Sequence, residues 1–432
     1  MVFWKSRYVM IDKIFGRSTV IYYIFLLLIL VTWTNVDSLP PLPLRLAYLT
    51  AIMGPLWKER SLSTPIVLFT FVVISGSSFA ISYMPVDGLY ISIVLLISYM
   101  LCRPNIDRIK FPSALIILTI LSLFVDFFSG GEMNFSFKLV AVLLSTLFIS
   151  RSNEGTLQIV TFSIILISFV IAVEFIIMGG EFSQTVSTID GEIDRKGWAD
   201  PNYFGAVLGY GVIASFIALY KWPNMTKKTR YAIILALVLS FYTILSTASR
   251  GVFVAIVASV VILLFTGSGS ISKKISFLLL IFLGVLVFYQ LGFFDLILLR
   301  FNSDAGDAGG RTLIWGPRLH AFFNDCSFIE QCFGIGFKNA RFLGTNVLLG
   351  SHNDYIAILT SYGYIGAICL LAILCYPFFK AKENKSFVMA ATLYMATCMF
   401  SIEPFTGGHW SIYYFYLYIV LLSQFRMKNN SI

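Results

Sequence analysis

The stretch 231–266, YAIILALVLSFYTILSTASRGVFVAIVASVVILLFT, decides how this chain folds. It is apolar throughout and carries one charged residue, Arg250. As a single helix it would be about 54 Å long at 1.5 Å per residue, whereas the hydrocarbon core of a bilayer is about 30 Å thick. We therefore expect two membrane-spanning helices that meet at STASRG, with Arg250 in the turn between them.

Apolar runs of spanning length recur over the whole chain. Of its 432 residues, 58% are hydrophobic and 12% are charged, whereas a soluble protein carries about 25% charged residues. The sequence predicts an all-α polytopic membrane protein in which residues 1–432 form one integral membrane domain. We expect about 14 transmembrane helices, with 12–14 as the range, because the second run is rich in proline. The predicted spans are 19–36, 40–56, 65–83, 86–102, 111–128, 135–150, 157–178, 201–220, 231–248, 251–266, 275–294, 353–375, 386–402 and 409–425.

The distribution of charge predicts the orientation. With the N-terminus inside, most Lys and Arg residues fall on the inner side and most acidic residues on the outer side, as the positive-inside rule requires. Both termini are then cytoplasmic. The one long loop, 295–351, is then outside, between predicted helices 11 and 12. The basic pI of about 9.1 is thus a signal of topology and does not indicate nucleic-acid binding.

Arg250 is the first candidate functional residue on the outer side. An arginine between two spans is costly in lipid and usually faces a cavity or a functional pathway, although it can also reach the headgroups from the end of a helix. Its neighbours Ser249 and Gly251 are small, which allows a ligand or another backbone to approach. A guanidinium group suits bidentate contact with a phosphate.

The stretch GSHNDYIAILTSYGYIG, 350–366, changes from polar to apolar. Ser351 is a suitable N-cap, which would put His352 in the first turn of a helix. The positive end of the helix dipole disfavours a charged imidazole there, and a neutral imidazole can act as a general base. A buried, hydrogen-bonded histidine that only orders the loop is the alternative.

Other outer features are open to two interpretations. In KGWADPNYFG, 196–205, Asp200 and Pro201 fit ordinary helix capping as well as a site. RTLIWGPRLHAFF, 311–323, predicts a short amphipathic helix interrupted at Gly316-Pro317. FGIGF, 333–337, predicts a turn whose N–H groups could approach a ligand.

The outer cysteines and histidines are the candidates for a disulfide and for a metal site. Cys326 and Cys332 could form a disulfide in an oxidising compartment or remain free. No two of the outer histidines, His320, His352 and His409, have the spacing of metal ligands, so we expect no metal site.

In order and spacing, the SRG turn, GGRTLIW, FGIGF and SHNDYIAILTSYGYIG resemble the O-antigen ligase and polymerase superfamily, over roughly 200–370. The resemblance implies a GT-C-like glycosyltransferase of the bacterial inner membrane that acts on the periplasmic face. Its donor and acceptor would be undecaprenyl-diphosphate-linked oligosaccharides, with no metal or other cofactor. Membrane lipids and a chain-length regulator are further candidate partners. It assigns the catalytic base to His352, the diphosphate contacts to Arg250, Arg311, Arg318 and Arg341, and supporting roles to Asn353, Asp354, Asp200 and Asn202.

Three functions fit this resemblance to different degrees. DPNYFG and SHNDY are more similar to polymerases of O-antigen, capsule or exopolysaccharide repeat units. An O-antigen ligase, which transfers the glycan to lipid A–core, tends to have Asn, Ser or Gln where this chain has Asp354. A transporter or flippase of lipid-linked sugar is the third possibility, but neither repeated halves nor paired broken helices are evident.

Overall fold

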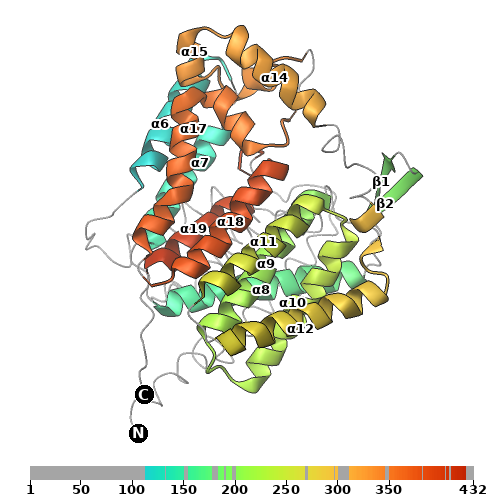
Figure 1. Ribbon diagram of the computed structural model, residues 1–432. Coiled ribbons are helices and arrows are strands. Elements are labelled where there is room, and N and C mark those ends of the chain that lie inside the picture. The colour runs from blue at the N-terminus through green and yellow to red at the C-terminus, as the bar shows by residue number, and fades with distance from the viewer. Residues whose placement is uncertain are drawn as a thin grey trace, which may run out of the picture.

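The computed structural model shows a bundle of helices with several short helices over one end (Figure 1). The structure describes residues 112–131, 133–149, 154–177, 183–188, 191–196, 201–267, 271–295, 297–299, 311–345, 350–381, 383–403, 405–407 and 410–424. The predicted spans 19–36, 40–56, 65–83 and 86–102 lie outside the described residues.

Each predicted span from residue 111 onward forms a helix. Among the described residues, α8, α9, α10 and α17 contain segments long and apolar enough to cross a membrane, and α6, α11 and α19 contain shorter apolar segments. The chain is therefore a helical polytopic membrane protein, while the total of about 14 spans stays a prediction. The helices are α6 (Ser113–Phe128), α7 (Asn134–Ile149), α8 (Glu154–Ile177), α9 (Pro201–Lys221), α10 (Lys227–Ser246), α11 (Arg250–Thr266), α12 (Ile271–Gln290), α17 (Asp354–Lys380), α18 (Lys385–Ser401) and α19 (Trp410–Gln424).

The predicted break in the run 231–266 is confirmed. Helix α10 ends at Ser246 and α11 begins at Arg250. The hydroxyl of Thr247 donates to the carbonyl of Ile244 at 2.7 Å and accepts from the N–H of Ser249 at 3.3 Å. Ala248, between them, has a φ of 48°. These local bonds close a turn of three residues, so the chain reverses direction where the apolar run becomes too long for one span.

Turns that were predicted to lie on one side of the membrane do lie together. A Cβ atom on Gly251 would be 2.2 Å from the hydroxyl oxygen of Ser401, and one on Gly407 would be 3.2 Å from the phenol oxygen of Tyr203. The starts of α9 and α11 therefore meet the turn after α18. The predicted alternation of the spans is confirmed for these elements, and the identity of this side as the outer one stays a prediction.

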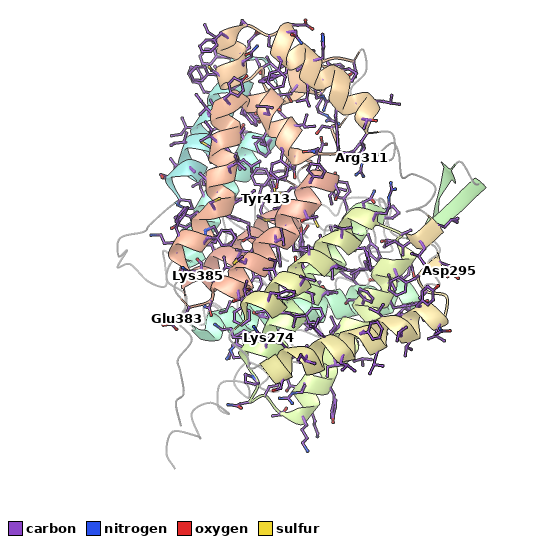
Figure 2. All side chains as sticks on the ribbon, in the orientation of Figure 1. Lys274, Asp295, Arg311, Glu383, Lys385 and Tyr413 are labelled. Carbon is purple, nitrogen blue, oxygen red and sulfur yellow. The ribbon has the colours of Figure 1, made fainter. Side chains whose placement is uncertain are left out.

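The opposite ends of the same helices also meet. The Lys221 ammonium donates to the side-chain oxygen of Asn384 at 3.2 Å, and the hydroxyl of Ser386 donates to the carbonyl of Thr266 at 2.6 Å. Figure 2 shows Lys274 and Lys385 in the same half of the molecule, whereas Arg311 lies in the other half, near α14. Basic residues thus mark the end that the sequence predicts to be cytoplasmic.

In its described residues, the long loop forms the helices α14 (Thr312–Asn324), α15 (Phe328–Phe333) and α16 (Phe337–Ala340). Figure 1 shows α14 and α15 above α6, α7 and α17. The predicted interruption at Gly316-Pro317 is wrong, because α14 continues through Pro317. A proline removes only one helical hydrogen bond, and this one lies near the start of the helix.

A β-hairpin is a further element of the predicted outer loop 179–200. Strands β1 (Ser183–Thr188) and β2 (Gly191–Lys196) pair antiparallel, with Val186 opposite Ile193. β-Branched residues fit a pleated strand, so the hairpin agrees with the local sequence although we expected helices alone.

Of the two alternatives for Cys326 and Cys332, the structure shows the free form, since both cysteines are free. Cys326 lies in the turn after α14, where its N–H donates to the carbonyl of Ala321 at 3.2 Å. Cys332 lies inside α15, with its carbonyl against Gly363 of α17. The two residues are therefore held by different neighbours. Burial raises the pKa of Cys326, which disfavours the reactive thiolate.

The FGIGF segment packs against a break in α17 and donates hydrogen bonds to it. This helix is interrupted at Gly363, which has a φ of 66°. The N–H groups of Ile335 and Gly336 donate to the carbonyls of Thr360 and Ser361 at 3.4 and 3.0 Å. These N–H groups therefore bind carbonyl groups just before the break and do not face a ligand.

A buried carboxylate, which the sequence analysis missed, holds the other side of FGIGF. Asp126 of α6 accepts from the N–H of Phe337 at 2.9 Å, the hydroxyl of Ser136 at 2.7 Å and the phenol of Tyr362 at 3.0 Å. These three bonds connect α6, α7 and α17 to the long loop. They hold the loop over this end of the bundle, and so they position the arginines that the loop carries.

This packing predicts that Gly334→Ala destabilises the protein. Gly334 has a φ of 87°, and a Cβ atom there would be 2.0 Å from the carbonyl oxygen of Ser361. We expect a loss of at least about 2 kcal/mol from backbone strain and overpacking, measured as a lower apparent Tm in detergent.

Gly316→Ala is the matched control in the same loop. A Cβ atom on Gly316 would have no atom within 4 Å. Alanine also favours a helix over glycine by up to about 1 kcal/mol, so this variant should unfold at or above the wild-type temperature. Equal Tm values for the two variants would contradict the packing of FGIGF against α17.

Candidate functional site

The residue that caps α17 is Asn353, two residues later than predicted. Its side-chain oxygen accepts from the N–H groups of Tyr355 and Ile356 at 3.0 and 3.2 Å. The prediction that Ser351 is the cap is wrong, because the polar groups of Ser351 bind elsewhere. His352 therefore lies just outside the helix and not in its first turn.

Asp354, the first residue of α17, is buried and holds the turn between α18 and α19. Its carboxylate accepts from the N–H groups of Phe405 and Thr406 at 2.8 and 2.7 Å, and from the hydroxyl of Thr406 at 2.7 Å. Tyr413 donates its phenol proton to the carbonyl of Phe405 and so extends the contact to α19. The carboxylate is thus enclosed by donors from one turn, and its role is to position that turn.

Ser351, on the other side of His352, is also buried. Its N–H and its hydroxyl both bind the carboxylate of Glu403. The hydroxyl also lies 2.7 Å from the carbonyl oxygen of Asn353, and the indole N–H of Trp315 donates to the Ser351 carbonyl at 2.6 Å. Contacts from α14, α17 and the turn after α18 therefore converge on this residue.

His352 stands between these buried residues and is itself exposed. Its φ is 51°, in the left-handed region that costs a non-glycine residue about 1–2 kcal/mol. Within the described ranges, Ala248 is the other non-glycine residue with a positive φ. Such strain gathers at functional sites, and here the two strained positions lie in the turns that carry His352 and Arg250.

Arg250 occupies the first position of α11 and is partly buried. The preceding Ser249 donates its hydroxyl proton to the side-chain oxygen of Asn202 at 3.1 Å, which ties this turn to the first turn of α9. A guanidinium group at a helix N-terminus is well placed to hold an anion, since the helix dipole acts in the same direction.

The loop arginines occupy different environments. Arg318 is almost fully buried and donates to the carbonyl of Arg341 at 3.3 Å. Burial lowers the pKa of Arg318, the charge of Glu403 raises it, and the charge of Arg341 lowers it. Arg341 is partly buried, 5.9 Å from the ring centre of Phe337, and Arg311 is partly buried at the start of α14. The structure therefore brings Arg318 and Arg341 together and places Arg318 beneath the surface.

The structure describes some of the remaining predicted residues and not others. Asp200 and His409 lie outside the described residues. His320 is exposed on α14, and its carbonyl accepts from Asn324. In the described part of the chain, no group of three His, Cys, Asp or Glu side chains could hold a metal ion.

Glu403 belongs to the site although no motif marked it, and so does Trp315, the last residue of the GGRTLIW motif, to which the sequence analysis gave no role. In the sequence, Glu403 is an isolated acidic residue, and Trp315 belongs to the predicted amphipathic helix 311–323. Their contacts with Ser351 join segments far apart in the sequence, so no local pattern could identify them.

The left-handed conformation of His352 predicts an order of stability among substitutions at this position. His352→Gly should be more stable than His352→Ala by about 1–2 kcal/mol, because glycine adopts positive φ without strain. The apparent Tm values of the two purified variants test this. An alanine variant that is at least as stable as the glycine variant would contradict the described turn.

Comparison with known sequences agrees with this arrangement. The family described as O-antigen ligase matches residues 235–371, which include Arg250, the helices of the long loop and His352. No curated protein matches the chain. Over this region the chain is similar to the O-antigen ligase family, which supports the resemblance to the O-antigen ligase and polymerase superfamily.

Proposed function

We propose that this protein is an inner-membrane glycosyltransferase that polymerises undecaprenyl-diphosphate-linked oligosaccharide repeat units on the periplasmic face. Such units build O-antigen, capsule or exopolysaccharide. The proposal includes a GT-C-type fold, cytoplasmic termini and an inverting reaction without a metal ion. The match of residues 235–371 to the O-antigen ligase family supports a lipid-linked glycan as substrate, and the positive-inside charge pattern supports the orientation.

The observation that carries the proposal is the conformation of His352. It is exposed and strained, yet buried polar residues hold it on both sides. Its turn meets Glu403 in the segment that follows α18, and the end of α18 meets Gly251, the neighbour of Arg250. A candidate base and a candidate phosphate ligand therefore belong to the same end of the bundle.

In the proposed reaction, the oxygen of an acceptor hydroxyl attacks the anomeric carbon of the donor sugar. His352 takes the proton from that hydroxyl, and the bond from the anomeric carbon to the diphosphate oxygen breaks with its electron pair on the diphosphate. Arg250, Arg311 and Arg341 would hold the charge that develops there, as preorganised cations can. Arg318 is buried and donates to the carbonyl of Arg341, so we assign it a role in positioning Arg341.

The ligase remains the second candidate function, because the matching family is described as O-antigen ligase. The sequence difference that favours a polymerase is Asp354, and this residue binds Phe405 and Thr406 inside the protein. It can therefore influence the choice of acceptor only through the shape of the His352 turn. A transporter is less favoured, because carbonyls at the break in α17 are bonded by the FGIGF segment.

The function is tested by an in vitro transfer assay with purified protein and a polyprenyl-diphosphate-linked oligosaccharide. A polymerase should extend the lipid-linked donor into a ladder, whereas a ligase should form product only with lipid A–core. His352→Ala should lower the rate by about 10²–10⁴-fold, the usual contribution of a general base. His320→Ala, also exposed on the outer loop, is the control and should stay near wild type. A His352→Ala rate above a tenth of wild type would exclude the catalytic role.

Arg250 should not tolerate replacement by lysine. Lysine keeps the charge but not the planar group that contacts two phosphate oxygens, so Arg250→Lys should lose most polysaccharide in a complementation assay, as Arg250→Ala should. Full complementation by the lysine variant at equal protein level would show that Arg250 supplies charge alone.

A further inference from the structure

Glu403 contacts the turn of His352 more closely than its place in the sequence indicates. It follows the end of α18, and its carboxylate accepts from both the N–H and the hydroxyl of Ser351. The second carboxylate oxygen lies against Gly350, where a Cβ atom would be 2.7 Å away. The side chain therefore spans the two residues that precede His352.

The contact between Glu403 and Ser351 helps to hold His352 in its strained conformation. The N–H of Ser351 is in a fully buried residue, and a buried donor without an acceptor carries a free-energy cost. That is comparable with the strain at His352. If the carboxylate were removed, the turn could relieve both costs by rotating, and the imidazole would leave its exposed position.

The charge of Glu403 also reaches the long loop. It acts on the buried guanidinium of Arg318, which in turn donates to the carbonyl of Arg341. One carboxylate thus touches the turn of the candidate base and influences the arginines that the loop contributes.

We propose that Glu403 is a positioning residue that holds the Ser351–Asn353 turn, so that His352 stays exposed at the end of the bundle where Arg250 lies. The proposal rests on the proposed transferase function. It assigns Glu403 no contact with substrate and no proton transfer of its own.

Two variants separate the mechanical from the electrostatic part of this role. Glu403→Ala removes the acceptor and the charge, whereas Glu403→Gln keeps an oxygen for the Ser351 N–H and removes only the charge. Because a displacement of about 1 Å can cost 10²-fold in rate, Glu403→Ala should lower kcat by about that factor with little change in KM. Glu403→Gln should fall between Glu403→Ala and wild type.

Glu330→Gln is the matched control. Glu330 is an exposed glutamate of the same predicted side, and it binds only Ser327 in a capping box at the start of α15. Glutamine also serves at this capping position. The control variant should therefore keep wild-type kcat and KM.

The decisive measurement is a double-mutant cycle with His352→Ala. If Glu403 acts through His352, adding Glu403→Ala to His352→Ala should cause no further loss of kcat. A loss that multiplies with that of His352→Ala, or a Glu403→Ala rate within threefold of wild type, would overturn the proposal. Ser351→Ala, which leaves Glu403 in place, should show the same dependence on His352.

Hydrogen exchange tests the turn without any assay of activity. The Ser351 N–H should be protected in the wild type and exchange faster in Glu403→Ala, while α9 and α18 keep their protection. Unchanged exchange at Ser351 would overturn the proposal by itself. Faster exchange together with a wild type that transfers no glycan would instead remove the proposed function and leave the role of Glu403 in holding the turn.

Discussion

The hydrogen bonds of one buried carboxylate, Asp354, determine where the candidate site can be. They join the first residue of α17 to the turn between α18 and α19. A buried polar group left without its partners costs about 1–3 kcal/mol, and Asp354 is fully buried, so solvent cannot replace these donors. Once this contact forms, the preceding residues have limited freedom. Asn353 caps the helix and Ser351 binds Glu403. The side chain of His352, which lies between these two buried residues, is therefore exposed.

A second buried carboxylate, Asp126, fixes the part of the site that comes from the long loop. It binds FGIGF from one side while the break in α17 binds it from the other. The loop is thereby connected to three helices. Arg318 lies in α14, before FGIGF, and Arg341 directly follows α16, after it. Both carboxylates are compensated by several donors, as buried charges require. The candidate site is exposed, but each part that holds it is buried.

The helical elements could be predicted from the sequence, because hydrophobic length and charge act locally. The run 231–266 divides at Arg250 as its length requires, and the turns predicted to share a side do contact one another. The details of the site could not be predicted in the same way. Ser351 and Asn353 are both good caps, and the choice between them goes with contacts distant in sequence, those of Ser351 with Glu403 and of Asp354 with Phe405 and Thr406. Cys332 likewise lies against Gly363 of α17, a neighbour distant in sequence.

The central claim is that His352 and Arg250 act on the same lipid-linked sugar at one end of the helical bundle. A structure of the protein with a non-hydrolysable polyprenyl-diphosphate sugar bound tests it most directly. The account predicts that the Arg250 guanidinium lies within hydrogen-bond distance, about 2.7–3.2 Å, of the diphosphate oxygens. It also predicts that the His352 imidazole faces the open side of the anomeric carbon, with room for an acceptor hydroxyl between them. A diphosphate bound away from Arg250, or a sugar whose anomeric carbon His352 cannot approach, would contradict it.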